Sequence, residues 1–193
     1  MISALVLAAG QSRRMGRAKM ALPWGETTVL GHVIDVFRAA SIEDVLVVSG
    51  GDRAAVEQVA EHCRARVVFN PRYAEQDMLS SVQIGLQAMS GATQASFIVL
   101  GDQPQVLETT VRRLLDAYER TSSPLVVPSY QMRRGHPWIV ARALWPALLS
   151  MQGPETPRDF LRAHVGQILH IDVDTPTVLD DLDTPEDYLK SQG

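Results

Sequence analysis

Cysteine is almost missing from this chain of 193 residues, because Cys63 is its single thiol. An intramolecular disulfide is therefore impossible, and thiolates cannot assemble a zinc cluster. The five histidines do not follow a metal-ligand spacing such as His-x-x-x-His. Cys63 lies in a predicted helix-to-strand connection, and we expect it to be a partly buried small hydrophobic side chain.

Long hydrophobic runs and an excess of positive charge are missing too. No segment approaches the ~20 apolar residues that a membrane span needs, and the N-terminal MISALVLAAG lacks the basic start of a signal peptide. We therefore expect a cytoplasmic protein without a membrane partner. The net charge of −4 gives no indication of a nucleic-acid partner, because such partners usually require a basic surface.

Short apolar runs alternate with segments of helical spacing, and this alternation predicts the fold class. Continuous runs rich in Val, Ile and Leu are typical of strands buried on both faces, as in parallel sheets. Such strands are expected at 4–8, 45–48, 67–69, 97–100 and 125–127, and helices around 29–37, 56–60, 79–89 and 111–118. The sequence thus predicts a three-layer αβα, Rossmann-like α/β fold with a mostly parallel sheet.

Shorter elements follow one another after Pro128. Strands are expected at 138–140 and 168–173, and helices at 143–149, 157–164 and 184–190. Nothing in this part has the composition of a linker, a repeat or a low-complexity segment, and the length suits one sizeable core better than two. We expect residues 1–193 to form a single domain.

A cluster of cations and glycines follows the first predicted strand, in residues 7–19 (LAAGQSRRMGRAK). Ligands of open parallel sheets bind beyond the carboxyl ends of the strands, and glycines let backbone N–H groups approach an anion closely. Arg14 and Lys19 would add charge-assisted bonds to phosphate oxygens. The segment is neither a P-loop nor a G-x-G-x-x-G turn. A phosphate-binding loop and an ordinary solvated basic loop are both compatible with these residues.

Two acidic positions are candidates for a metal site at the same edge. Asp102 lies in residues 101–104 (GDQP), directly after a predicted strand, and a carboxylate beside a phosphate site usually holds Mg²⁺. Asp183 precedes Thr184 and Pro185, which carry the signature of a helix start. A plain turn at Asp102 and a solvated loop acid at Asp183 are the competing interpretations.

A histidine between glycine and proline is the fourth feature, at residues 133–137 (RRGHP). On an exposed turn, His136 could recognise a base or an acceptor phosphate. A plain turn ahead of the strand expected at 138–140 explains the same residues.

Taken together, these segments resemble the nucleotidyltransferases that modify molybdopterin, the MobA-like NTP transferase family. GDQP, RGHP and D-x-D-T-P are similar to that family at 101–104, 134–137 and 181–185, as are Asn-Pro at 70–71 and the MLSSV that follows at 78–82. The signature LAAG-x-S-x-R-M-G-x-x-K is matched at Leu7, Ala8, Ala9, Gly10, Ser12, Arg14, Met15, Gly16 and Lys19. Together, in the family's order, these motifs span nearly the whole chain.

The resemblance implies a fold of the nucleotide-diphospho-sugar-transferase type. It also implies transfer of CMP from CTP to molybdenum cofactor, with release of pyrophosphate. The guanylyltransferase branch usually reads LAGG where residues 7–10 read LAAG here. The pair Ala8-Ala9 therefore favours the molybdenum cofactor cytidylyltransferase branch and CTP over GTP.

The resemblance further implies a role for each matched residue. Arg14, Lys19 and Asp102 would be catalytic, and Asp102 and Asp183 would bind Mg²⁺. Arg134 and His136 would face the acceptor, and a molybdoenzyme would be the partner that receives the product. The implied nucleotide-binding residues are Leu7, Ala8, Ala9, Gly10, Ser12, Arg14, Gly16, Lys19, Ser80, Ser81 and Asp102.

Two departures from the family pattern keep alternatives open. Asp77 stands where a glycine usually precedes the Met-x-x-Ser stretch, and residues 131–133 (QMR) replace an acidic or glycine-rich lead into RGHP. A guanylyl- or cytidylyltransferase with another phosphorylated acceptor is one alternative. A non-catalytic maturation partner of a molybdoenzyme is the other, and retention of four charged site residues argues against it: Arg14, Lys19, Asp102 and Asp183.

Overall fold

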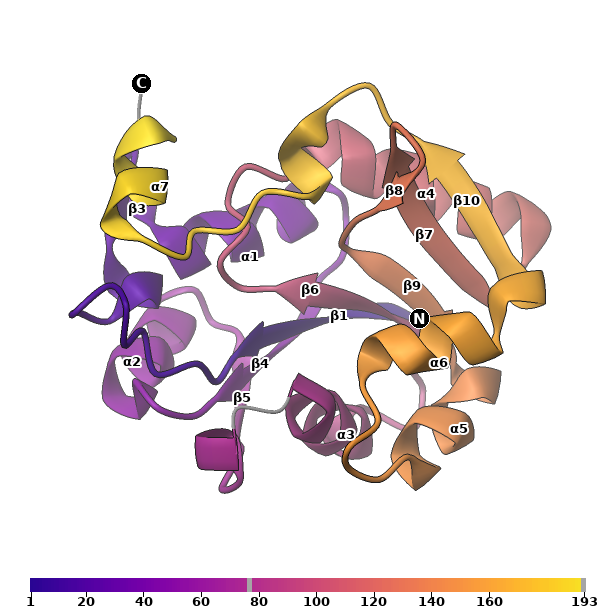
Figure 1. The fold of residues 1–193 in the computed structure, drawn as a ribbon, viewed down its shortest axis with the longest axis horizontal. Helices are drawn as coiled ribbons and strands as arrows, with labels where there is room; N and C mark the ends of the chain where they lie inside the picture. The colour runs from indigo at the N-terminus through magenta and orange to yellow at the C-terminus, as the bar shows by residue number, and fades with distance from the viewer. Residues whose placement is uncertain (76–77, 192–193) are drawn as a thin grey trace.

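A single mixed sheet forms the centre of the molecule in the computed structural model, which describes residues 1–75 and 78–191 (Figure 1). Its strand order is β10-β7-β9-β6-β1-β4-β5, and β8 pairs with β7 off this path. The strands are β1 (Ile2–Ala8), β4 (Asp44–Ser49), β5 (Arg66–Phe69), β6 (Ala95–Leu100), β7 (Leu125–Tyr130), β8 (Arg133–Arg134), β9 (Trp138–Ala141) and β10 (Ile168–Asp172). Because β9 runs antiparallel between β6 and β7 while β5, β4, β1 and β6 are parallel neighbours, the predicted mostly parallel sheet is confirmed.

Helices cover both faces of this sheet and complete the three predicted layers. One face carries α1 (Val29–Ala39), α2 (Arg53–His62) and α4 (Glu108–Thr121), and the other carries α3 (Met78–Ala88), α5 (Trp145–Ser150) and α6 (Pro157–Ala163). Successive side chains of a strand point to opposite faces. Within β1, Ala4 and Val6 accordingly enter the first core, and Leu5 and Leu7 enter the second. Among the described residues, no helix has the length and apolar character required to cross a membrane.

Three short strands and one longer strand differ from the sequence expectations. The hairpin β2 (Pro23–Trp24) and β3 (Thr27–Thr28), like β8, consists of strands of two residues, too short for a periodic pattern. The strand expected to end at residue 127 continues as β7 through Pro128 to Tyr130. Proline lacks an N–H but keeps its acceptor, and Pro128 O accepts from Gly135 N at 2.9 Å.

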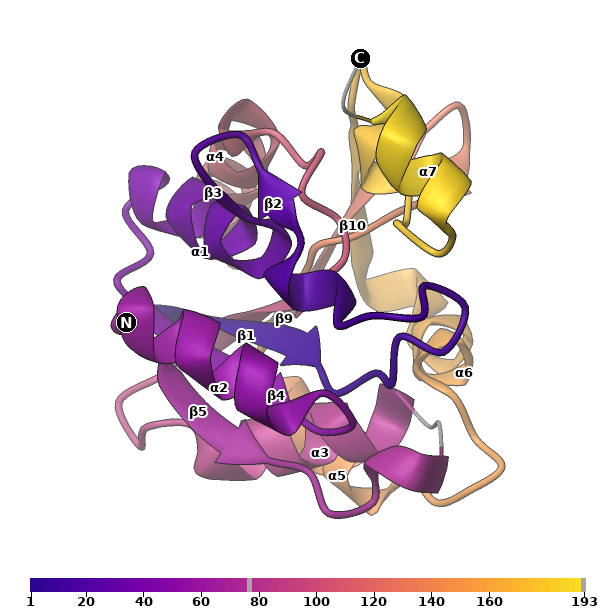
Figure 2. The same cartoon turned by 90° about the vertical axis from the view of Figure 1, so that its left-hand side faces the viewer.

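The C-terminal helix α7 (Pro185–Lys190) packs beside the hairpin β2–β3 (Figure 2). It begins with the predicted N-cap, a capping box in which Thr184 and Asp187 bond each other's backbone N–H groups. Tyr188 Oη donates to Pro23 O at 2.6 Å. A third small core joins the two ends of the chain: Met15, Leu22, Val29, Leu182 and Tyr188, with Trp24 packed against them. This core brings the segment before α7 beside the loop that follows β1.

Candidate functional site

The loop after β1 folds back on itself around one serine. Ser12 O accepts from the N–H groups of Met15 and Gly16, and Ser12 Oγ accepts from Lys19 N at 3.0 Å. Gly16 has φ +64°, a conformation that glycine adopts without steric cost. Met15 is buried in the small core that contains α7. The loop therefore has a defined shape, anchored at its middle by an apolar side chain.

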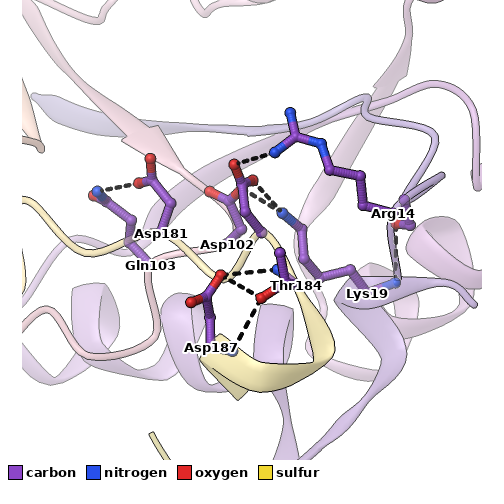
Figure 3. A network of polar contacts seen from close by, with 9 residues as sticks. Arg14, Lys19, Asp102, Gln103, Asp181, Thr184 and Asp187 are labelled. Atoms are coloured by element: carbon purple, nitrogen blue, oxygen red, sulfur yellow. Dashed lines mark hydrogen bonds and ion pairs between the residues drawn. The ribbon is translucent and has the colours of Figure 1, made fainter. Parts of the chain in front are cut away.

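Two cations of this loop meet two carboxylates from distant parts of the chain (Figure 3). Lys19 Nζ lies 2.6 Å from Asp102 Oδ2 and 3.6 Å from Asp183 Oδ1, and Arg14 Nη1 lies 2.9 Å from Asp183 Oδ2. Asp102 reaches this point because β6 and β1 are parallel neighbours. The structure thus brings together all four charged side chains that the sequence singled out.

The two ends of this ion-pair network differ in exposure. Side-chain exposure is 11% for Lys19 and 22% for Asp102, against 73% for Arg14 and 48% for Asp183. An exposed pair such as Arg14–Asp183 contributes little stability, about 0–1 kcal/mol. The sheltered Lys19–Asp102 pair is less screened by solvent. Arg14 and Asp183 are therefore free to exchange partners at low cost.

The carboxylates of Asp102 and Asp183 suit a hard divalent cation. Both already contact one positively charged group, the ammonium of Lys19. Within residues 1–75 and 78–191, no group of three or more His, Cys, Asp or Glu side chains is arranged to hold a metal. Mg²⁺ is usually held by one or two carboxylates, with water and substrate phosphates as its other ligands. The residues present fit that mode of binding.

A cavity of about 680 Å³ opens between the loop and α3. Most of the predicted nucleotide-binding residues line it, together with Asp183: Leu7, Ala9, Gly10, Ser12, Arg14, Lys19, Ser81 and Asp102. Ala8, Gly16 and Ser80 are not among its described lining residues. Ala8 is 1% exposed and packs in the core instead. This cavity is large enough for a small organic ligand.

Asn70 and Tyr73 are site residues to which the sequence analysis gave no role. Asn70 is fully buried, and its Nδ2 donates to Ser80 Oγ at 3.0 Å and to Ser81 Oγ at 2.9 Å. It thereby ties the end of β5 to the start of α3, where Ser81 meets the cavity. Tyr73 lines the cavity from the short helix after Asn70. The Asn-Pro pair directly after a predicted strand is the sequence signal for this turn.

The first turn of the loop packs against the ends of both neighbouring strands. Gly51 N donates to Ala9 O and Gly101 N to Leu7 O, both at 3.0 Å. A Cβ on Gly50 would collide with Ala9 O and with Tyr73 Cβ. Glycine at position 50 is therefore needed for the close approach of these segments.

The two residues predicted to face an acceptor lie apart from this cavity. Arg134 is exposed on β8, and neither it nor His136 is among the described residues that line the cavity. The His136 ring stacks on Trp138 with centroids 4.3 Å apart, and its buried Nε2 has no hydrogen-bond partner within the described ranges. Burial, with a contribution from Arg158, lowers the pKa of His136 to about 3. His136 is therefore neutral near pH 7, and its acceptor role remains a prediction.

The two departures from the family pattern have different outcomes. Asp77 lies outside the described residues. Gln131 and Met132 form the tip of the β7–β8 hairpin, with φ of 48° and 66°. Met132 is 94% exposed, so the tip presents an apolar side chain to the solvent.

Comparisons with known proteins agree on the family. Residues 4–168 match the MobA-like NTP transferase domain. Molybdenum cofactor cytidylyltransferase of Escherichia coli K12 is 26% identical over 192 residues, covering 99% of this chain and 95% of that protein. Nicotine blue oxidoreductase of Paenarthrobacter nicotinovorans is 30% identical over 197 residues, covering 96% and 93%.

Solved structures give the same picture. The crystal structure of Rv0371c from Mycobacterium tuberculosis H37Rv superposes with a TM-score of 0.81 at 30% identity, covering 99% of this chain and 97% of that chain. Rv0371c has also been solved in complex with manganese, with a TM-score of 0.77 at 28% identity over the same shares of the two chains.

The matched domain spans most of the chain and contains the basic loop, Asp102 and every described lining residue of the cavity except Asp183. The names of the relatives differ, so the acceptor does not follow from the family alone. What the fold, the site and the comparisons establish together is that this chain belongs to the MobA-like NTP transferase family and is an enzyme of the nucleotidyltransferase type.

Proposed function

We propose that this enzyme transfers CMP from CTP to the phosphate of molybdenum cofactor and releases pyrophosphate. The observation that carries the proposal is the meeting of two cations and two carboxylates at one cavity beyond the carboxyl ends of β1 and β6. That combination suits a triphosphate with its metal. The similarity to an Escherichia coli protein named for this activity supports the choice of acceptor.

In the proposed reaction, the protein chiefly positions the reactants and stabilises charge. An oxygen of the acceptor phosphate attacks the α-phosphorus of CTP. A new P–O bond forms as the bond between the α-phosphorus and the bridging oxygen of the β-phosphate breaks, and pyrophosphate leaves. Arg14 and Lys19 hold the triphosphate and stabilise the charge on the leaving pyrophosphate. The acceptor phosphate is already an anion at neutral pH, so no side chain has to remove a proton.

Asp102 and Asp183 are the residues that would hold Mg²⁺, which when bound neutralises phosphate charge. In the protein alone these carboxylates pair with Lys19 and Arg14. Binding of the metal-bound nucleotide therefore exchanges one set of ion pairs for another. Charged hydrogen bonds to phosphate are strong enough to offset the loss of the exposed pairs.

The preference for cytosine follows in this proposal from the first turn of the loop. Leu7, Ala9 and Gly10 line the cavity, and the methyl group of Ala9 takes space that a glycine would leave open. A smaller base fits the narrower space. Ser81, at the same cavity, offers a hydroxyl group for a hydrogen bond to the base or the ribose.

The direct test is pyrophosphate release from CTP and from GTP with purified molybdenum cofactor and Mg²⁺. We expect release with CTP and a much lower rate with GTP. Thermal shifts with CTP, GTP, ATP and UTP provide a separate measure of nucleotide binding, since a ligand stabilises by RT ln(1 + [L]/Kd). Greater stabilisation by GTP than by CTP would contradict the argument from Ala8-Ala9.

A different phosphorylated acceptor is the second candidate. It is favoured by the β7–β8 hairpin tip, where the exposed Met132 and Arg133 replace the family's usual acidic or glycine-rich lead. The same assay distinguishes the two candidates. CTP-dependent pyrophosphate release with a sugar phosphate, and none with molybdenum cofactor, would favour the second.

A further inference from the structure

The segment before α7 is attached to the turn after β6 by two hydrogen bonds at consecutive residues. Leu182 N donates to Asp102 O at 3.1 Å, and Gln103 Nε2 donates to Asp181 Oδ1 at 2.7 Å. The first bond uses the backbone of the residue that also supplies the carboxylate to Lys19. The place of Asp183 relative to Asp102 is therefore set by its two preceding residues.

The two aspartates of this D-x-D segment point to different partners. Asp183 contacts both Arg14 and Lys19. Asp181 makes no ion pair within the described residues and instead accepts from Gln103, on the far side of Asp102 from Arg14 (Figure 3). Two aspartates on either side of a single residue could be taken for two equivalent metal ligands. In the structure they have different partners, because only Asp183 contacts the two cations.

Gln103 is suited to holding Asp181 rather than to contacting substrate. It is 4% exposed and is not among the described residues that line the cavity. Its NH₂ group is the part of the amide that can donate to a carboxylate. Between the two aspartates, Leu182 is fully buried in the small core with Met15 and Tyr188. The buried amide of Gln103 and the buried side chain of Leu182 thus fix the segment that places Asp183.

We propose that Asp181 and Gln103 are positioning residues, which act through their mutual hydrogen bond to keep Asp183 at the cation site, and that Asp181 is not itself a metal ligand. This inference rests on the proposed function, because it presupposes a metal-bound nucleotide at Asp102 and Asp183. Its physical basis is that a ligand displaced by a fraction of an ångström loses much of its contribution, so the groups that orient ligands are nearly as important as the ligands.

The test is Mn²⁺ binding in the presence of CTP, measured by electron paramagnetic resonance on the whole protein. Asp181→Asn keeps an oxygen that accepts from Gln103 and removes the charge, so we expect affinity within about 2-fold of the wild type. Asp181→Leu and Gln103→Leu each remove the hydrogen bond, and we expect a loss of about 10-fold, at the lower end of the range for groups that orient ligands. The double variant should be no worse than either single variant, because both act through one bond.

Steady-state kinetics add a measure that a general loss of stability would not change. We expect Asp181→Leu to raise the Mn²⁺ concentration needed for half-maximal rate, with kcat near the wild-type value at saturating Mn²⁺. Asp180→Asn is the matched control and should bind Mn²⁺ like the wild type, since it changes an exposed acid in the same segment. Asp181 is exposed as well, so its variants serve as the test even where Gln103→Leu fails to fold.

The outcomes separate this inference from the proposed function. If Asp183→Asn loses Mn²⁺ affinity and Asp181→Asn loses as much, Asp181 contributes charge and the positioning role is wrong. Wild-type affinity in Asp181→Leu would show that the burial of Leu182 positions Asp183 by itself, which also overturns the inference. If Asp183→Asn binds Mn²⁺ like the wild type, the proposed metal site is wrong, and the inference built on it is wrong with it.

Discussion

Lys19 is the side chain through which the two carboxylates of the site are connected. It is 8% exposed and contacts Asp102 and Asp183 at once. Lysine is buried only when it is paired, and here its partners are the two groups proposed to hold a metal. Lys19 therefore pairs with these carboxylates in the protein alone, and in the proposed nucleotide complex it contacts the triphosphate.

Replacing Lys19 with alanine should weaken the binding of CTP with Mg²⁺ by about 10- to 100-fold, because a hydrogen bond to a charged group contributes ~1.5–3 kcal/mol. Isothermal titration of the variant measures this directly. Lys190→Ala is a matched control, since Lys190 is the chain's other lysine and is exposed on α7. Unchanged affinity in Lys19→Ala would remove Lys19 from the nucleotide site.

His136 should make the folded protein sensitive to acid. Its pKa is lowered from 6.5 to about 3 in the folded state, so the unfolded chain takes up a proton first as the pH falls. The contribution of neutral His136 to the free energy of unfolding is complete above pH 6.5. Below that pH it falls by about 1.4 kcal/mol per pH unit, until the pH reaches the folded pKa of about 3.

His136→Phe keeps an aromatic ring to stack on Trp138 and removes the titrating group. Urea denaturation at pH 7, 6 and 5 should show a free energy of unfolding that falls less steeply in the variant than in the wild type. Equal slopes would mean that His136 is protonated in the folded protein at these pH values.

At the level of single residues, the sequence indicated which charged side chains meet, but it did not indicate which neighbouring side chains line the cavity. The charged residues that the sequence singled out do meet at one cavity: Arg14, Lys19, Asp102 and Asp183. The sequence could not separate Ser80 from Ser81. Ser80 is fully buried, whereas Ser81 lines the cavity. This difference depends on the rotation of α3 about its own axis against β1.

The contact between α3 and β1 is tight enough to require a glycine. A Cβ on Gly85 would collide with the side chain of Leu5. In an exposed helix Gly→Ala is favourable by about 1 kcal/mol, but overpacking a core costs about 1–3 kcal/mol. We expect Gly85→Ala to lower the free energy of unfolding, measured with urea. The control is Gly91→Ala, which meets no atom within 4 Å and should be nearly neutral.

Among elements, those with a repeating apolar pattern were predictable. The five strands of the first part and α1 to α4 follow directly from such patterns. The expected burial on both faces is wrong for β5, because it is the edge strand of the sheet and its residues are exposed or half-buried. The hairpin β2–β3 and strand β8 have two residues each, and their pairing depends on what lies beside them. The antiparallel direction of β9 could not be predicted from its composition either, because the direction of a strand depends on how the chain connects it to its neighbours.

The whole molecule should unfold as one unit. Both large cores share the same sheet, and the small core around α7 includes residues from both ends of the chain. Far-UV circular dichroism and the fluorescence of the three tryptophans should therefore give coincident urea transitions. An earlier fluorescence transition would indicate that the region around Trp24 and α7 unfolds separately, and would contradict the single-domain prediction.

The distance in sequence between the partners of the site has a consequence for synthesis on the ribosome. Arg14 and Asp183 are 169 positions apart, although their side chains form an ion pair. When β10 has emerged, every strand of the sheet has been made, yet Asp181 and Asp183 have not. All strands of the sheet are therefore synthesised before the last side chain of the ion-pair network. A chain truncated after β10 would contain every strand of the sheet and would lack Asp183.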